Sequence, residues 1–366
     1  MNKKAYSIYT VVLAAALVFV LSAACLFSPE KDFSESERRK LAKFPEFSAE
    51  TLLNGKFMEG FESYSLDQFP LRDSFRRLKA FAQYNVFNLK DSNGIYVADG
   101  YAAKLVYPLK EGSVLDAAAK FGEIYDLYLG NSSGNIVVSV VPDKGYFLGE
   151  ANGYPVMDYE RLEKLLTENM PYAEYCGIFD TLSIEDYYTT DTHWRQEKIL
   201  PAAKKIAAAL GFELSERYTE NEAEVDFYGV YYGQSALPLP ADRINYVTSK
   251  VISGATVYNA ETGATGGIYD FGKLQSKDPY EFFLSGAAAL LTVENPSAEE
   301  EKELVIFRDS FGSAIAPYLI EGYSKVTLVD TRYIAPALLG DYVDFTNCDV
   351  LFLYSTLVLN ESSVLK

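Results

Sequence analysis

Short apolar runs alternate with amphipathic segments along most of this chain. The runs at 136–141, 304–307, 326–329 and 350–354 are rich in Val, Leu, Ile and Phe and are too short to be typical helices. Such runs are typical of strands that are buried on both faces of a sheet. The sequence therefore predicts an α/β fold, with a mostly parallel sheet that carries helices on both faces.

Other segments repeat their apolar residues at the three-to-four-residue spacing of an amphipathic helix. Pro70 is expected to break the first of them, because a proline removes a hydrogen bond from a helix interior. These helical segments are 61–84, 113–129, 159–169 and 201–210.

The N-terminus has the pattern of a membrane-spanning helix. No charged residue lies between Ala5 and Pro29, and a span needs roughly 20 apolar residues. Lysines precede this stretch and the acidic segment 30–37 follows it, which places the N-terminus inside and the remainder outside. Residues 1–29 are therefore expected to form one transmembrane helix that anchors an extracytoplasmic domain in the cell membrane.

Two other interpretations of the N-terminus stay open. A signal peptide could be cleaved near residues 21–24. A lipoprotein could form at Cys25, although Ser22 stands where an aliphatic residue is usual. All three interpretations export the remainder of the chain.

After the anchor, residues 30–60 are charged and are expected to form a polar stalk that docks onto the domain. Residues 61–366 are expected to form that domain. Residues 213–300 lack the strand and helix alternation and are rich in Gly, Ala, Tyr and Glu. We interpret them as an insertion with hairpins that covers a cleft.

Composition narrows the classes of function. The formal net charge of −18 argues against nucleic-acid binding, which needs Lys and Arg to neutralise phosphates. The chain has 29 Tyr and 1 Trp, which fits a cleft for sugars or peptides, or simply a Tyr-rich core and rim. A disulfide between Cys176 and Cys348 is an open question, because sequence does not show their proximity.

We expect neither a cofactor nor a metal. His193 is the only histidine, so a metal site of several histidines is excluded. No pair of cysteines has the spacing of a zinc site. A site for a hard cation made only of carboxylates stays open.

Asp191 and His193 are the first pair of candidate catalytic residues. If the segment is extended, both side chains point to the same face. A carboxylate beside an imidazole fixes the tautomer of the ring and stabilises its charged form, as a general base requires. Trp194 could then exclude water from the site. The alternative is that Asp191 caps a helix and His193 is an ordinary half-buried residue.

Ser310 follows the predicted strand 304–307 at the start of a helix. The free backbone N–H groups there, with Phe311 and Gly312 next in the chain, would favour an oxyanion. Gly312 would also allow a close backbone approach. The alternative is that Ser310 or Asp309 simply caps the helix, and Asp309 is also a candidate ion partner.

Polar residues follow two other predicted strands. Arg332 and Tyr333 follow 326–329, and Lys144 follows 136–141. Because the carboxyl ends of parallel strands meet at one edge of a sheet, these side chains are candidates for binding substrate. Arg332 could hold a developing charge or pair locally, and Lys144 is the weaker candidate because most such lysines are solvated.

The residues around Asp191–Trp194 and Arg308–Gly312 resemble those of the DHHW proteins, bacterial relatives of the SGNH-like domains of alginate O-acetylation proteins. The resemblance covers most of the exported domain. Thr192 stands where the name-giving motif has His, and in an extended segment it points away from its two neighbours. Further similar segments are 35–45, 64–73, 227–233 and 330–333.

This resemblance implies an SGNH-hydrolase-like fold and a triad of nucleophile Ser310, base His193 and orienting Asp191. It also implies an acetyl-enzyme intermediate, a polysaccharide acceptor and a membrane-bound O-acyltransferase as the acetyl donor partner. We therefore expect O-acetyl transfer to a cell-wall or extracellular glycan. The alternatives are a carbohydrate esterase with the same triad and a glycan-binding or assembly subunit without activity.

Overall fold

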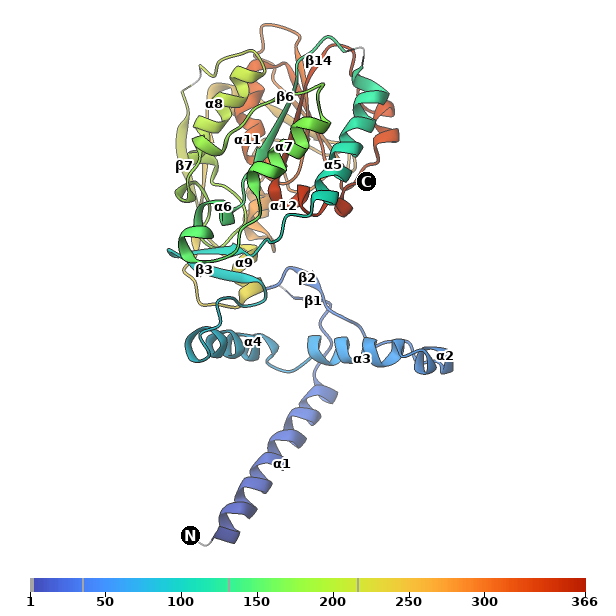
Figure 1. Cartoon of the computed structure of the whole chain (residues 1–366), viewed down its shortest axis with the longest axis vertical. Coiled ribbons are helices and arrows are strands. Elements are labelled where there is room, and N and C mark those ends of the chain that lie inside the picture. The colour runs from blue at the N-terminus through green and yellow to red at the C-terminus, as the bar shows by residue number, and fades with distance from the viewer. Residues whose placement is uncertain (1–2, 35, 131, 216) are drawn as a thin grey trace. The chain divides into compact units, whose positions relative to one another are not determined.

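The computed structural model describes residues 3–34, 36–130, 132–215 and 217–366 (Figure 1). The chain divides into two compact units. One contains Met1–Asn93 and Tyr232–Pro238, and the other contains Gly94–Tyr231 and Leu239–Lys366. Residues 61–93, which the sequence analysis grouped with the sheet domain, thus group with the N-terminal residues. Of the expected anchor and stalk, residues 1, 2 and 35 lie outside the described residues.

The N-terminal unit begins with helix α1 (Lys3–Phe27). Its window Lys4–Cys25 is long and apolar enough to cross a membrane and has none of its surface buried in the structure. A core helix of a soluble protein would be buried, so α1 has the properties of a membrane span or of a signal anchor. The expected N-terminal apolar helix is confirmed.

Three amphipathic helices follow α1 in the same unit. Pro70 lies between the second and the third, as expected, because the proline ring is incompatible with a continuous helix there. A π-helical turn (Ala82–Val86) continues the third helix. The elements after α1 are β1 (Phe33–Ser34), β2 (Arg39–Lys40), α2 (Ala49–Leu53), α3 (Lys56–Asp67) and α4 (Arg72–Phe81).

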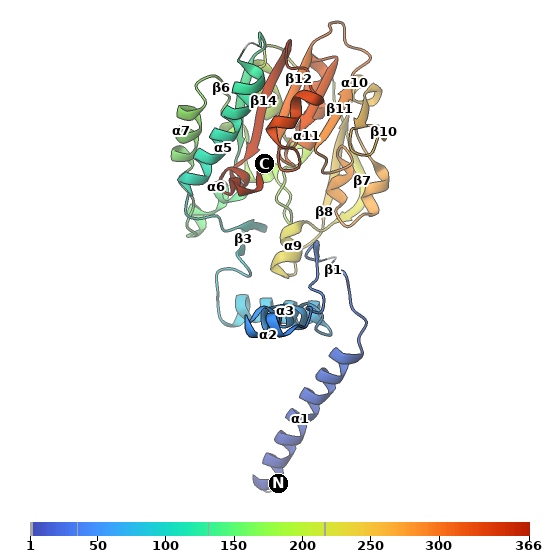
Figure 2. The same ribbon diagram turned by 90° about the vertical axis from the view of Figure 1, so that its right-hand side faces the viewer.

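The second unit is built on an eight-stranded sheet in the order β10-β9-β11-β13-β12-β14-β5-β6 (Figure 2). The five strands from β13 to β6 pair in parallel, and β9, β10 and β11 pair antiparallel at the other side. The four predicted strands correspond to β5, β12, β13 and β14, which are neighbours. The strands are β5 (Ile136–Val141), β6 (Glu174–Tyr175), β9 (Thr256–Asn259), β10 (Thr265–Gly266), β11 (Leu290–Glu294), β12 (Glu303–Arg308), β13 (Lys325–Val329) and β14 (Cys348–Ser355).

Helices cover both faces of this sheet. Along β12, Leu304 and Ile306 pack into the core beneath α8 (Leu200–Ala209) and α11 (Gly312–Leu319). Val305 and Phe307 pack into the core beneath α5 (Glu111–Ile124) and α7 (Tyr159–Asn169). All four side chains are at most 1% exposed, and burying each contributes about 1.5–3 kcal/mol. The predicted mostly parallel α/β fold is confirmed.

Residues 213–300 are more varied than one insertion. They contain a separate two-stranded hairpin of β7 (Thr219–Phe227) and β8 (Asp242–Thr248). They also contain β9, β10 and β11, which extend the central sheet. The extension was not predicted, because β9 and β10 have only four and two residues and β11 lies in a segment without regular alternation.

Cys176 and Cys348 are both buried and are not joined to each other.

Short elements complete the unit. The remaining helices and strands are β3 (Ile95–Ala98), β4 (Tyr101–Lys104), α6 (Lys144–Leu148), α9 (Val230–Ser235), α10 (Lys250–Gly254) and α12 (Thr356–Leu359). A π-helical turn lies at Tyr125–Leu129, and 3₁₀ turns lie at Glu150–Asn152, Phe179–Thr181, Ile184–Asp186, Gln196–Lys198, Phe271–Gln275, Pro279–Phe282, Ile320–Gly322, Pro336–Asp341 and Ser362–Val364.

Candidate active site

Ser310 lies in the turn between the central strand β12 and helix α11, at the carboxyl edge of the parallel sheet. Asp309 holds this turn. One oxygen of its carboxylate accepts the Phe311 N–H at 3.0 Å, and the other accepts the N–H of Ser355, the last residue of β14, at 2.8 Å. Asp309 is 1% exposed. Both carboxylate oxygens of Asp309 therefore accept backbone N–H groups, and Asp309 fixes the conformation of the turn.

The structure brings Ser310, His193 and Asp191 together in one chain of hydrogen bonds. Ser310 Oγ lies 2.7 Å from His193 Nε2, and His193 Nδ1 lies 2.6 Å from Asp191 Oδ1. Because a carboxylate accepts at Nδ1, that nitrogen carries the proton, and Nε2 is left to accept the Ser310 hydroxyl proton. Residues 117 positions apart in the sequence thus meet with the geometry of a nucleophile, a base and an orienting acid.

Backbone N–H groups fix the Asp191 carboxylate, which is fully buried. Oδ1 accepts the His193 N–H at 3.0 Å, and Oδ2 accepts the Val230 N–H at 2.8 Å. A Cβ at Gly229 would come within 2.5 Å of the Asp191 backbone. Only glycine therefore allows this close approach, so segment 227–233 contributes to the site through its backbone.

The segment that carries Asp191 and His193 is bent, which corrects the extended conformation that was expected. The bend follows from the Asp191 carboxylate bonding the backbone two residues ahead, a common local alternative to a strand. Thr192 nevertheless points away from the triad, since its hydroxyl accepts the Tyr231 O–H at 3.0 Å.

Aromatic rings fix the imidazole plane. The Tyr280 ring stacks on His193 with centroids 3.8 Å apart and planes within 5°. Sequence analysis missed Tyr280, because it lies in a segment without periodicity. Trp194 is fully buried and donates its indole N–H to the Phe311 carbonyl at 3.1 Å. Trp194 therefore links the His193 segment to the turn that carries Ser310, and its buried ring does not face a substrate.

Phe311 and Gly312 do not offer free donors for an oxyanion, which corrects the expectation for both. The Phe311 N–H is bonded to the Asp309 carboxylate, and the Gly312 N–H to the Asp309 carbonyl at 3.1 Å. A Cβ at Gly312 would meet the Arg308 side chain at 2.7 Å, so glycine is needed there for packing. The Ser310 N–H has no acceptor among the residues that the structure describes, and it is the better candidate donor.

Lys144 is buried, and this corrects its placement as a solvated or substrate-facing group. Its ammonium donates to the carbonyls of Tyr188 and Thr189 at 2.8 and 3.2 Å, just before Asp191 in the chain. It also lies 5.1 Å from the ring centre of Tyr231. Burial lowers the pKa of Lys144 to about 7, although the nearby Asp191 opposes that shift. Lys144 thus supports the loop that carries Asp191 and His193.

Arg332 pairs locally, which is one of the two alternatives that the sequence left open. Its guanidinium donates twice to the buried Asp330 carboxylate, at 2.8 and 2.6 Å. Burial opposes ionisation, but the hydrogen-bonded Asp330 carboxylate raises the pKa of Arg332. The Tyr333 ring, 53% exposed, lies 5.6 Å from the guanidinium carbon. Both residues follow β13, the parallel neighbour of β12, and Tyr333 is the more accessible of the two.

Within the described ranges, no group of three or more His, Cys, Asp or Glu side chains lies close enough to hold a metal ion. The hydrogen-bond chain from Asp191 through His193 to Ser310 is an arrangement that can activate a serine. No known family model matches the sequence, and no curated protein matches it significantly.

Solved structures with the same fold were found at low sequence identity. A DHHW family protein from Eubacterium siraeum is 21% identical, with a TM-score of 0.59 over 75% of this chain and 94% of that chain. PatB1 from Bacillus cereus, in a structure with a sulfonyl adduct, is 17% identical, with a TM-score of 0.56 over 72% of this chain and 94% of that chain. A second structure of PatB1 is 16% identical, with a TM-score of 0.53 over 72% and 96% of the two chains. The expected resemblance to DHHW proteins is thus confirmed in the fold of this chain.

Proposed function

We propose that this protein is an O-acetyltransferase that modifies a cell-wall or extracellular glycan through an acetylated Ser310. The hydrogen-bond chain from Asp191 through His193 to Ser310 carries the proposal, because an ordinary helix cap or a buried histidine needs no such relay. His193 is the only histidine of the chain, and its two ring nitrogens are both used in this relay.

In the first half-reaction, Ser310 Oγ attacks the carbonyl carbon of an acetyl donor and gives its proton to His193 Nε2. The new C–O bond forms a tetrahedral oxyanion, and the free Ser310 N–H is the donor that would face it. The bond to the leaving group then breaks, and the leaving group takes the proton from His193. Asp191 stabilises the charged imidazole between these two transfers.

In the second half-reaction, a sugar hydroxyl attacks the acetyl carbon. His193 takes the hydroxyl proton, the ester bond to Ser310 breaks, and the proton returns to Ser310 Oγ. The product is an O-acetylated sugar and the free enzyme. Water in place of the sugar hydroxyl gives acetate, so a carbohydrate esterase is the alternative with the same residues.

Transfer is favoured over hydrolysis by the resemblance to proteins of O-acetylation, since α1 would anchor an esterase equally well. An extracytoplasmic active site has no cytoplasmic acetyl donor at hand. A membrane-bound O-acyltransferase that passes acetyl groups across the membrane is the partner that this arrangement needs. Accordingly we place the catalytic unit outside the cell, with α1 as its single span.

Covalent labelling tests the nucleophile. The PatB1 neighbour was solved with a sulfonyl adduct, and sulfonyl fluorides react with activated serines. We expect one adduct per chain by intact mass, at Ser310 by peptide mapping. Ser310→Ala should take up no label, and Ser297→Ala, at an exposed serine of the same unit, should be labelled like the parent. Labelling elsewhere, or none in the parent, would leave the glycan-binding alternative.

The acceptor decides between transfer and hydrolysis. Incubation with p-nitrophenyl acetate should give acetyl-Ser310, and added cell-wall oligosaccharide should then remove the acetyl group with formation of a sugar ester detected by mass spectrometry. If only free acetate forms at every oligosaccharide concentration, the protein is an esterase.

A further inference from the structure

The N-terminal unit exposes an unusual amount of apolar side chain. Among the described residues, fourteen large apolar side chains between Phe44 and Leu89 are exposed, against eleven in the 273 residues from Gly94 to Lys366. Single exposed apolar residues need no explanation, but a dense set of them marks a contact surface.

The clearest part of this set lies on helix α4. Phe75, Leu78 and Phe81 follow one another at three-residue spacing, and they are 44%, 62% and 53% exposed. Leu71, immediately before the helix, is 71% exposed. Side chains at this spacing share one face of a helix, so α4 carries a continuous apolar stripe.

The opposite side of α4 is packed within its own unit. Ala80 is 1% exposed, and Arg76 donates to the carbonyls of Gly233 and Gln234 at 2.8 and 3.1 Å. Arg76 also lies 3.3 Å from Glu37. These contacts fix how α4 is rotated and leave Leu78 and Phe81 more than half exposed. Phe75, at the start of the stripe, packs edge-on against Phe69 with ring centroids 5.5 Å apart.

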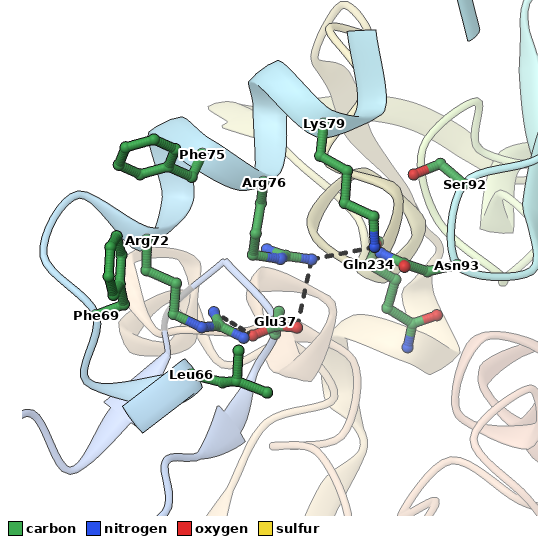
Figure 3. Close-up of a pocket in the computed structure, with 10 residues that line it drawn as sticks. All are labelled: Glu37, Leu66, Phe69, Arg72, Phe75, Arg76, Lys79, Ser92, Asn93 and Gln234. Carbon is green, nitrogen blue, oxygen red and sulfur yellow. Dashed lines mark hydrogen bonds and ion pairs between the residues drawn. The ribbon is translucent and has the colours of Figure 1, made fainter. Parts of the chain in front are cut away.

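Positive charge accompanies the stripe. Arg77 and Lys79 are exposed and project from the two flanks of the stripe at the 3.6-residue helical repeat. Figure 3 shows a pocket beside α4 in which Phe69 and Phe75 stand at one end and Lys79 at the other, with Arg72 and Arg76 around Glu37. An apolar stripe with a cationic border is the pattern of a helix that lies in a membrane interface.

Charge also separates this unit from the remainder of the chain. Residues 28–93 contain 11 Lys and Arg and 11 Asp and Glu, and residues 94–366 contain 20 and 40. The sheet unit would therefore be repelled by an anionic membrane, whereas residues 28–93 of the N-terminal unit are neutral overall and have their own cationic border.

We propose that α4 lies on the surface of the membrane that α1 spans, with Phe75, Leu78 and Phe81 among the lipid chains. The occupant is a phospholipid surface, because α1 places this unit at the membrane and the border of the stripe is cationic. The proposal concerns the N-terminal unit alone and stands independently of the acetyltransferase chemistry.

Tryptophan fluorescence tests this contact in the full-length protein. The only native tryptophan, Trp194, is buried in the sheet unit and supplies a constant background. We would reconstitute Phe81→Trp into phosphatidylcholine vesicles with or without brominated acyl chains. The matched control is Phe271→Trp in the sheet unit, where the native ring is 57% exposed against 53% for Phe81.

After the constant Trp194 background is subtracted, brominated lipid should lower the tryptophan emission of Phe81→Trp about two-fold. The emission of Phe271→Trp should not change. The reason is that an interfacial helix reaches ~5–10 Å into the headgroup and acyl boundary. Adding Leu78→Glu to Phe81→Trp should reduce this quenching, because a carboxylate in the middle of the stripe opposes its entry among the lipid chains. Circular dichroism checks that each variant is folded, and Leu78→Trp replaces Phe81→Trp if the latter is not.

Two outcomes would overturn the proposal. Absence of quenching in a folded Phe81→Trp would show that the stripe does not reach lipid. If the new tryptophan is also shielded from iodide in the water phase, a protein surface covers the stripe instead.

Discussion

The two units of this chain handle apolar residues in opposite ways. In the sheet unit, strands such as β12 and β14 bury nearly every side chain between two layers of helices. In the N-terminal unit, α3 has no buried residue and α4 has only Ala80 buried. The sheet unit carries the net charge, and residues 28–93 are neutral.

The two proposals assign different tasks to the two units, in line with this difference. Precise chemistry needs side chains that are held by packing and hydrogen bonds, and the side chains around Ser310 are held in this way. A surface that meets lipid needs exposed apolar side chains, which would be a liability on a soluble domain. The same residue types therefore stabilise one unit and remain available for contact in the other.

The largest expected effect is the loss of acetyl transfer when the Ser310 hydroxyl is removed, and this loss should not affect membrane contact. Ser310→Ala should lower the acetyl-transfer rate by at least about 10³-fold, because nucleophile and base act as one unit. His193→Ala should do comparable damage, and Asp191→Ala less, because it orients the ring. Rates are measured with p-nitrophenyl acetate and an oligosaccharide acceptor.

Ser310→Ala should leave the bromolipid quenching of a Phe81→Trp background unchanged, which is the control for an intact N-terminal unit. If Ser310→Ala keeps full activity and Asp309→Ala loses it, a carboxylate-centred reaction replaces the serine mechanism.

A pair of matched truncations tests the packing contrast. Phe352 is fully buried and stacks on Phe307 at 4.8 Å, so Phe352→Ala should cost about 3–5 kcal/mol of unfolding free energy. Phe81→Ala removes a ring that is 53% exposed, and it should change the unfolding free energy by less than about 0.5 kcal/mol in detergent. Urea titrations followed by circular dichroism measure both. Equal costs would mean that the α4 stripe is packed against protein.

The effect of burial on Lys144 can be tested through the pH dependence of the unfolding free energy. Its pKa is lowered by burial to about 7 in the folded state, and the unfolded lysine keeps its proton up to ~10.4. Between these values the unfolded state binds more protons, so the wild-type protein gains stability as pH rises from 7 toward 10. Lys144→Met lacks this gain, and its stability relative to wild type should fall over that range.

Urea denaturation at pH 6.5 and 9 measures this change, and Lys250→Met, at an exposed lysine of the same unit, is the control. The activity of Lys144→Met should also fall, since the carbonyls of Tyr188 and Thr189 lose their donor. A difference in stability that is the same at both pH values would contradict the lowered pKa of Lys144.

The smallest expected effect on activity is at Thr192. Thr192→Ala removes the acceptor of the Tyr231 hydroxyl, which costs about 1 kcal/mol of stability. Because Thr192 points away from His193 and Ser310, kcat/KM should change less than about five-fold. A loss as large as that of Asp191→Ala would show that the loop conformation depends on this bond.

Strong local patterns were sufficient for the fold. The four parallel strands, the break at Pro70 and the apolar N-terminal helix were predictable, because apolar runs and prolines act through neighbouring residues. The antiparallel strands β9, β10 and β11 were not predicted, because pairing with neighbouring strands, and not a distinctive composition, makes them strands.

At the site, the sequence by itself placed Ser310 after the predicted strand 304–307, and it placed Asp191 two residues before the only histidine, His193. Only the tertiary structure decided that Tyr280 stacks on His193, that Val230 holds Asp191, and that Lys144 is buried beneath the loop. It also showed that the N–H groups of Phe311 and Gly312 are already engaged. These contacts join distant segments through specific distances and angles, and a linear pattern carries no information about them.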